Sequence, residues 1–104
     1  MNIIEELGIT PGQWMVYTGH CFPGVNVITK SEWICEVGAA KNAGVRDDAR
    51  LIAAAPEMLE ALVEWCFYGE DYFGPSKRFK HTVYLIEKAT GKTWEEIKGL
   101  ICGN

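Results

Sequence analysis

Hydrophobic and polar positions in the first third of the chain follow the short period of β-strands. Strand-forming residues fill three runs, at 14–18, 25–29 and 33–37. A turn at 10–12 precedes the first run, and a loop at 19–24 separates the first two. The short connection at Lys30-Ser31 favours a hairpin. We therefore predict an antiparallel meander of about three strands.

From residue 46 onward the spacing of apolar residues becomes helical. Residues 47–62 form the strongest helical signal, but Pro56 removes a backbone hydrogen bond and clashes with the preceding turn. Ala55 before it is biased away from helical angles. We predict two helices here, one over 48–54 that begins at Asp47 or Asp48 and a longer one over 56–67. A loop is expected at 68–75.

The longer helix is expected to be the core helix, because its apolar stripe is broad. The residues assigned to that stripe are Met58, Leu59, Leu62, Val63 and Cys66. Three acidic residues, Glu57, Glu60 and Glu64, are assigned to its solvated face.

Capping signals predict three further helices. Ser76 should begin a helix that ends near Thr90, with Gly91 as its stop. Thr93 and Glu96 have the capping-box spacing and open a last helix that ends near 99–100. A short helix over 3–7 is expected at the start, with Asn2 as its cap.

The length of 104 residues indicates a single domain over 1–104. The sheet half should cover about 10–38 and the helical half about 46–101. The fold class is α+β: a small antiparallel sheet of about three strands followed by three to four helices packed on it.

Composition and charge narrow the function classes. A net charge of −4 argues against general nucleic-acid binding, which depends on basic residues facing phosphates. No apolar run approaches the roughly 20 residues of a membrane span. The N-terminus has no basic stretch followed by an apolar block, so we expect no secretory signal and a cytosolic protein.

Aromatic residues are numerous, with four Trp, four Tyr and four Phe. Such a number cannot all be buried in a domain this small, which favours an interface and a homo-oligomer. One set lies together in the sequence and fits a binding surface and core or loop packing equally well. It comprises Trp65, Phe67, Tyr68, Tyr72 and Phe73.

Basic residues gather at two predicted helix starts, where backbone N–H groups favour anions. With aromatic side chains to stack on a base, they could hold a phosphate-bearing small ligand; a solvated helix start is the plainer alternative. The candidate ligand-binding residues are Trp14, Tyr17, Trp33, Arg46, Arg50, Tyr72, Lys77, Arg78 and His81.

Catalysis and metal binding have weak support. His20, Cys21 and Cys35 could form a nucleophile pair or begin a metal site, but the remaining Cys66, Cys102 and His81 have no ligand spacing. We therefore expect no enzyme activity, no cofactor and no metal site. A small Cys/His hydrolase stays as an alternative.

The run ARLIAAAPEMLEAL at 49–62 resembles an "ARLIAAAPELLEAL"-type segment of small proteins encoded by tailed bacteriophages. The residues TPGQW at 10–14 look like the "TPGPW" opening of such proteins, with Gln13 in place of the usual proline. The resemblance implies an accessory phage protein made in the cytoplasm of the infected bacterial host. Proteins of that kind often blunt host defences or redirect host machinery.

These observations together predict a non-catalytic phage binding protein, with counter-defence as its role. It would sequester a nucleotide-type immune signal or occupy a host immune protein. A structural or assembly factor of the virion is a further alternative.

Overall fold

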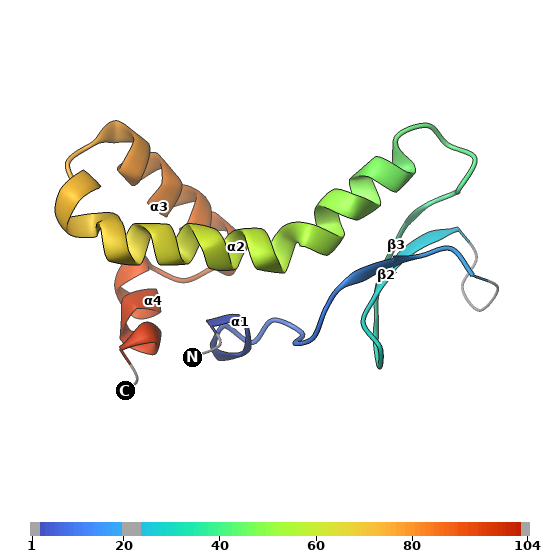
Figure 1. The fold of residues 1–104 in the computed structure, drawn as a ribbon, viewed down its shortest axis with the longest axis horizontal. Coiled ribbons are helices and arrows are strands. Elements are labelled where there is room, and N and C mark those ends of the chain that lie inside the picture. The colour runs from blue at the N-terminus through green and yellow to red at the C-terminus, as the bar shows by residue number, and fades with distance from the viewer. Residues whose placement is uncertain (1–2, 20–23, 103–104) are drawn as a thin grey trace. The chain divides into compact units, whose positions relative to one another are not determined.

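The computed structural model describes residues 3–19 and 24–102. Its elements run in the order α1 (Ile3–Glu6), β1 (Met15–Tyr17), β2 (Val25–Ile28), β3 (Trp33–Gly38), α2 (Val45–Phe73), α3 (Lys77–Thr90) and α4 (Trp94–Ile101) (Figure 1). The α+β class is confirmed. The chain divides into two compact units, Pro11–Pro56 and Met1–Thr10 with Glu57–Asn104, so the boundary falls inside α2.

The sheet unit contains the predicted antiparallel meander, in the order β1-β2-β3. Val16 pairs with Val27 across β1 and β2, and Val27 pairs with Cys35 across β2 and β3. The tight turn at 29–32 is also confirmed, because the Thr29 hydroxyl accepts hydrogen bonds from the backbone N–H groups of Ser31 and Glu32.

The core of the sheet unit forms between the central strand and the beginning of α2. Val25 and Val27 of β2 are fully buried and cluster with Val45 and Ala49 of α2. Ala49 has no side chain beyond Cβ, which lets helix and sheet approach closely. The Ala-rich sequence of this segment therefore has a packing role.

The helical unit has its own core, made from α1, the second part of α2, α3 and α4. Its buried residues are Ile3, Ile4, Leu59, Val63, Cys66, Phe79, Ile86, Trp94 and Ile97. Ile86 and Ile97 are completely buried. The apolar spacing of α2 supplies Leu59, Val63 and Cys66, which the sequence pattern assigned to the core.

The prediction of two helices around Pro56 is wrong, since α2 is one helix with Pro56 inside it. A proline inside a helix costs about 3 kcal/mol. Helical residues on each side are held by a separate core, Ala49 in the sheet unit and Leu59 and Val63 in the helical unit. Burial on both sides therefore offsets the lost hydrogen bond.

The predicted loop at 68–75 is also wrong over most of its length, because α2 continues to Phe73. Trp65 and Phe73 stack two turns apart, with ring centroids 5.3 Å apart and planes 11° from parallel. Glu70 receives hydrogen bonds from α4. These contacts keep a glycine-containing segment helical, and the chain turns only at Gly74-Pro75.

The capping predictions for the last two helices are confirmed. The Ser76 hydroxyl accepts a hydrogen bond from the Phe79 N–H, and Gly91 ends α3 in the left-handed conformation. Thr93 and Glu96 form a capping box at the start of α4. The predicted Asn2 cap lies outside the described residues.

Candidate functional site

The nine predicted ligand-binding residues fall into two groups that belong to different units. Five lie in the sheet unit: Trp14, Tyr17, Trp33, Arg46 and Arg50. Four lie in the helical unit: Tyr72, Lys77, Arg78 and His81.

Within the sheet unit, Trp33, Trp14 and Arg50 have structural partners. The Trp33 indole N–H donates a hydrogen bond of 2.9 Å to the buried Asn26 side chain. Trp14 packs against the core of the unit. Arg50 pairs with Asp47 at 2.7 Å on the exposed surface. Such an exposed pair contributes little to stability, and Arg46 is exposed as well.

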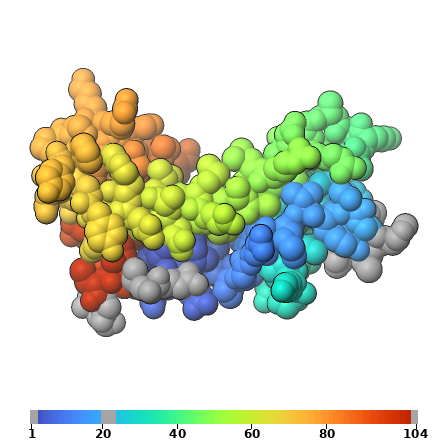
Figure 2. Space-filling model, viewed as in Figure 1, coloured from blue at the N-terminus to red at the C-terminus, as the bar shows by residue number. Residues whose placement is uncertain are grey.

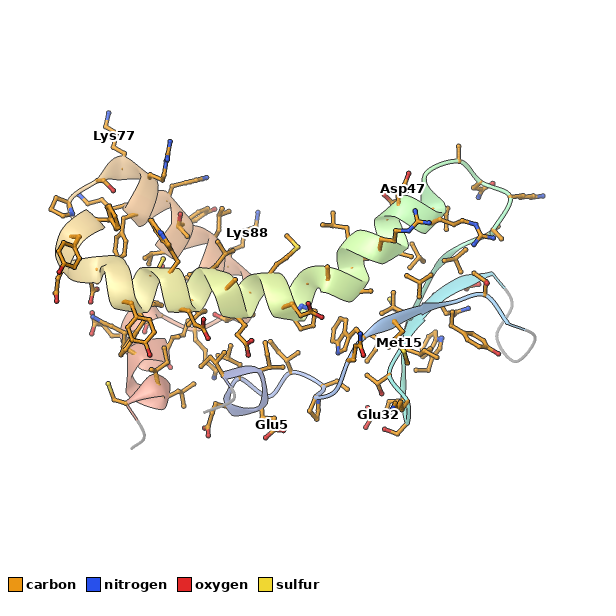
Figure 3. The ribbon with its side chains drawn as sticks, viewed as in Figure 1. Glu5, Met15, Glu32, Asp47, Lys77 and Lys88 are labelled. Carbon is orange, nitrogen blue, oxygen red and sulfur yellow. The ribbon has the colours of Figure 1, made fainter. Side chains whose placement is uncertain are left out.

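The basic residues Lys77, Arg78 and Lys80 at the start of α3 are exposed. Lys77 extends away from the helix in Figure 3. His81 stacks on Tyr84, with ring centroids 6.3 Å apart. The backbone N–H of Phe79, which could bind an anion at this helix start, is already occupied by Ser76.

A different surface stands out in the helical unit, on the second part of α2. Side chains at 58, 61, 65, 68 and 72 follow the alternating spacing of three and four residues that places them on one face of a helix. We call this face the α2 seam; it consists of Met58, Ala61, Trp65, Tyr68 and Tyr72. In Figure 2 this part of α2 is yellow and lies at the surface.

The α2 seam is open to solvent. Exposed fractions are 48% for Met58, 41% for Trp65, 75% for Tyr68 and 82% for Tyr72. The core of the unit uses another stripe of the same helix, with Leu59, Val63 and Cys66. The prediction that Met58 and Leu62 belong to the core is therefore wrong, and both are exposed because the helix carries two apolar faces.

The exposed area is comparable with the largest apolar patch on a typical monomer, about 300–600 Å² and often functional. An aromatic side chain presents on the order of 200 Å², so the α2 seam with Phe73 exposes roughly 500 Å². Contiguous apolar patches of this size, rimmed by polar residues, mark interaction sites in many proteins.

Trp65 and Tyr68 of the seam each contact neighbouring rings. Trp65 stacks on Phe73 and lies 6.2 Å from the buried Phe79 ring. Gly69 makes room for this stack, because a Cβ atom there would lie 2.9 Å from the Phe73 ring. Tyr68 meets Phe67 edge to face at 5.1 Å. Rings held in this way lose little conformational entropy when a partner binds.

Acidic residues line one side of the α2 seam at intervals of seven residues. These are Glu57, Glu64 and Asp71, all exposed. Within residues 3–19 and 24–102, none of the three side chains is part of an ion pair. The seam therefore combines an aromatic stripe with a negatively charged edge.

Two hollows meet at this edge, and Glu64 and Tyr68 line both. The first, of about 230 Å³, is completed by Ile3, Glu60, Val63, Phe67 and Ile101. The second is shallow and runs along the seam, lined by Ala61, Trp65, Gly69, Tyr72 and Phe73. Of the nine predicted ligand residues, these two hollows include Tyr72.

A polar network behind the seam holds α2 against α4. Glu70 accepts a 2.9 Å hydrogen bond from the Trp94 indole and contacts the Lys98 ammonium at 3.2 Å. The Trp94 hydrogen bond, with help from Lys98, lowers the pKa of Glu70. Glu70 thus fixes the helix that presents the seam.

Cys66 is poorly suited to act as a nucleophile. Burial raises the pKa of the Cys66 thiol to about 11, which keeps it protonated at neutral pH. No group of three metal-ligating side chains occurs within 3–19 and 24–102. His20 and Cys21 of the predicted pair lie outside the described residues.

The sequence groups Trp65, Phe67, Tyr68, Tyr72 and Phe73 as a possible surface, but the loop expected at 68–75 would separate its members. The alternating spacing from Met58 to Tyr72 was the signal that could have identified the seam. The assumed helix break after residue 67 concealed it.

Comparisons with known proteins indicate a phage protein family. A family model described as Salmonella phage P22 protein Y8K6 matches residues 1–93. No curated protein and no solved structure matches the chain. In the described part of the chain, no helix is both long and apolar enough to cross a membrane.

Proposed function

Because the chain belongs to the Salmonella phage P22 protein Y8K6 family, we propose that it is an accessory phage protein that binds a host protein through the α2 seam. Its binding is non-catalytic, and it occupies an immune protein in the cytoplasm of the infected bacterium. The chain is thus a phage protein whose proposed role is counter-defence.

The observation that carries this proposal is the exposed, ordered aromatic stripe. Trp and Tyr are enriched among the residues that contribute most to binding at protein interfaces. Trp65, Tyr68 and Tyr72 lie on adjacent turns, and Trp65 is fixed by stacking. A partner of opposite charge fits the acidic edge of the seam.

A protein partner is favoured over a nucleotide-type signal by the lining of the two hollows at the seam. Glu60 and Glu64 line the deeper one, and carboxylates there would repel a phosphate. Lys77 and Arg78 line neither hollow. Sequestration of a nucleotide-type signal would instead need a site built outside them, for instance between subunits of a homo-oligomer.

The test compares host-protein binding by the wild type and a seam variant, Tyr68→Ser with Tyr72→Ser. Both side chains are more than 70% exposed, so the fold should persist. Tyr84→Ser on α3 is the matched control, since Tyr84 is 56% exposed and lies outside the seam. Host proteins retained on each variant are quantified, and the retained protein is purified for calorimetry.

We expect the double variant to lose about 30-fold or more in affinity, the effect of truncating one strong interface residue. The control should bind like the wild type. Equal binding by all three would refute the proposal. Thermal stabilisation of the chain by a member of a cyclic-nucleotide panel, unchanged in the seam variant, would favour signal sequestration instead.

A further inference from the structure

The second part of α2 carries two apolar stripes, and only one is used by the core. Leu59, Val63 and Cys66 face the core, whereas the seam repeats the same spacing on the outer side. A stripe with alternating steps of three and four residues is the pattern by which one helix packs along another. The seam therefore has the form of half of a helix pair.

The residues that flank such a stripe contact the flanks of the opposing helix. On one flank of the seam every such position is acidic: Glu57, Glu64 and Asp71. On the other flank the corresponding positions hold Leu62 and Gly69. The seam thus has one charged edge and one uncharged edge.

A second copy of this helix does not complement that arrangement. If two seams paired antiparallel, the acidic edges would face each other, which is unfavourable. If they paired parallel, Glu57 and Glu64 would face Leu62 and Gly69, which offer no positive charge. The acidic edge calls for a partner with basic residues.

We propose that the seam binds an amphipathic helix of the partner protein, with lysine or arginine along the flank that meets Glu57, Glu64 and Asp71. This inference rests on the proposed function and specifies the partner's surface. An apolar stripe on the partner covers Trp65 and Tyr68, and its basic flank neutralises the acidic edge.

The deeper hollow beside the seam supports a basic side chain in this position. Its walls include the apolar residues Ile3, Val63 and Ile101, while Glu60 and Glu64 supply carboxylates. Lysine and arginine bury their aliphatic stems along apolar surface and keep the charged end at polar groups. One such side chain from the partner helix fits the hollow of about 230 Å³.

The test uses two synthetic helical peptides of three heptads, with leucine at the stripe positions. One carries lysine on both flanks and the other glutamate, so each peptide repels itself equally. Binding to the full chain is measured by fluorescence anisotropy at low and high salt. We expect the lysine peptide to bind about tenfold more tightly, because each of three ion pairs with the acidic edge should raise the affinity about two- to threefold. High salt should reduce this preference.

Substitution of the acidic edge tests whether its three carboxylates cause the preference for the lysine peptide. The variant Glu57→Gln, Glu64→Gln and Asp71→Asn should lose it. The control Glu5→Gln, Glu6→Gln and Glu32→Gln changes net charge equally and should keep it. Neither Glu5 nor Glu32 lies on α2, and Figure 3 shows Glu5 on α1 pointing away from it.

Equal binding of the two peptides, or a preference that survives the edge variant, would overturn this inference. So would sedimentation of a dimer that Tyr68→Ser with Tyr72→Ser makes monomeric, because the seam would then be covered by a second copy. Equal binding of the two peptides overturns the inference even where that binding needs Tyr68 and Tyr72, because the inference specifies a basic flank. The proposed function is refuted by a different result, in which the host protein binds the Tyr68→Ser, Tyr72→Ser variant as tightly as it binds the wild type.

Discussion

Glu70→Leu is expected to destabilise the helical unit by about 2–3 kcal/mol. The Glu70 carboxylate is the acceptor for the Trp94 indole and contacts Lys98 from α4. Trp94 is only 6% exposed, and leucine at position 70 leaves its N–H without this acceptor. An unsatisfied buried donor costs about 1–3 kcal/mol, and a hydrogen bond to a charged group is worth about 1.5–3 kcal/mol.

Two further variants separate the contributions. Glu70→Gln keeps an acceptor for Trp94 and removes the charge, so its cost should be about 1 kcal/mol. Glu95→Gln removes only the contact of Lys98 with a carboxylate whose side chain is 82% exposed, and should cost about 0–0.5 kcal/mol. Urea unfolding followed by circular dichroism at 222 nm gives the three values.

The pH dependence provides an independent check. The pKa of Glu70 is lowered from its ordinary value of 4.5, chiefly by the Trp94 hydrogen bond. Its charge therefore stabilises the fold above that pH, and the contribution is lost as the pH falls through the lowered pKa. The difference in the free energy of unfolding between the wild type and Glu70→Gln should therefore decrease as the pH is lowered. A cost for Glu70→Leu equal to that of Glu95→Gln would refute the role of the network.

Three more predictions concern single residues. Iodoacetamide at pH 8 should label the exposed Cys102 and should not label Cys66 until urea is added, because burial raises the pKa of the Cys66 thiol to about 11. Peptide mapping measures both labelling rates. Labelling of Cys66 in the native protein as fast as that of Cys102 would contradict its burial. Gly91→Ala should cost about 1 kcal/mol in urea unfolding, because φ is +71° and no neighbouring atom lies near to compensate. Thr93→Ala should also cost about 1 kcal/mol through loss of the capping box, and an unchanged unfolding midpoint would count against that cap.

Local signals in the sequence predicted much of the fold. The three strands, the Thr29–Glu32 turn, the Ser76 cap and the capping box depend on residues close in the chain, and each was readable. Local signals did not predict that α2 continues through Pro56 as a single helix. It depends on two cores that hold the helix on both sides of Pro56, and these involve residues far apart in the sequence.

For the candidate site too, the sequence predicted what depends on local residues and missed what depends on distant contacts. The aromatic residues from Trp65 to Phe73 were recognised as an unusual set, since composition alone makes full burial impossible. Their exposure on one helical face depended on the helix extending to Phe73, which stacking on Trp65 and the bonds of Glu70 stabilise. The predicted small-ligand residues share charge or ring type, and neither property specifies a common location in the fold.

The most direct test of the central claim is site-specific photocrosslinking in infected bacteria, with p-benzoylphenylalanine replacing Tyr68 on the seam or Tyr84 on α3. We expect position 68 to crosslink to one host protein, through an amphipathic helical peptide with a basic flank. Position 84 should not give that product. Equal crosslinks from both positions, or crosslinks from position 68 only to another copy of this chain, would contradict the assignment of the α2 seam as the host-binding face.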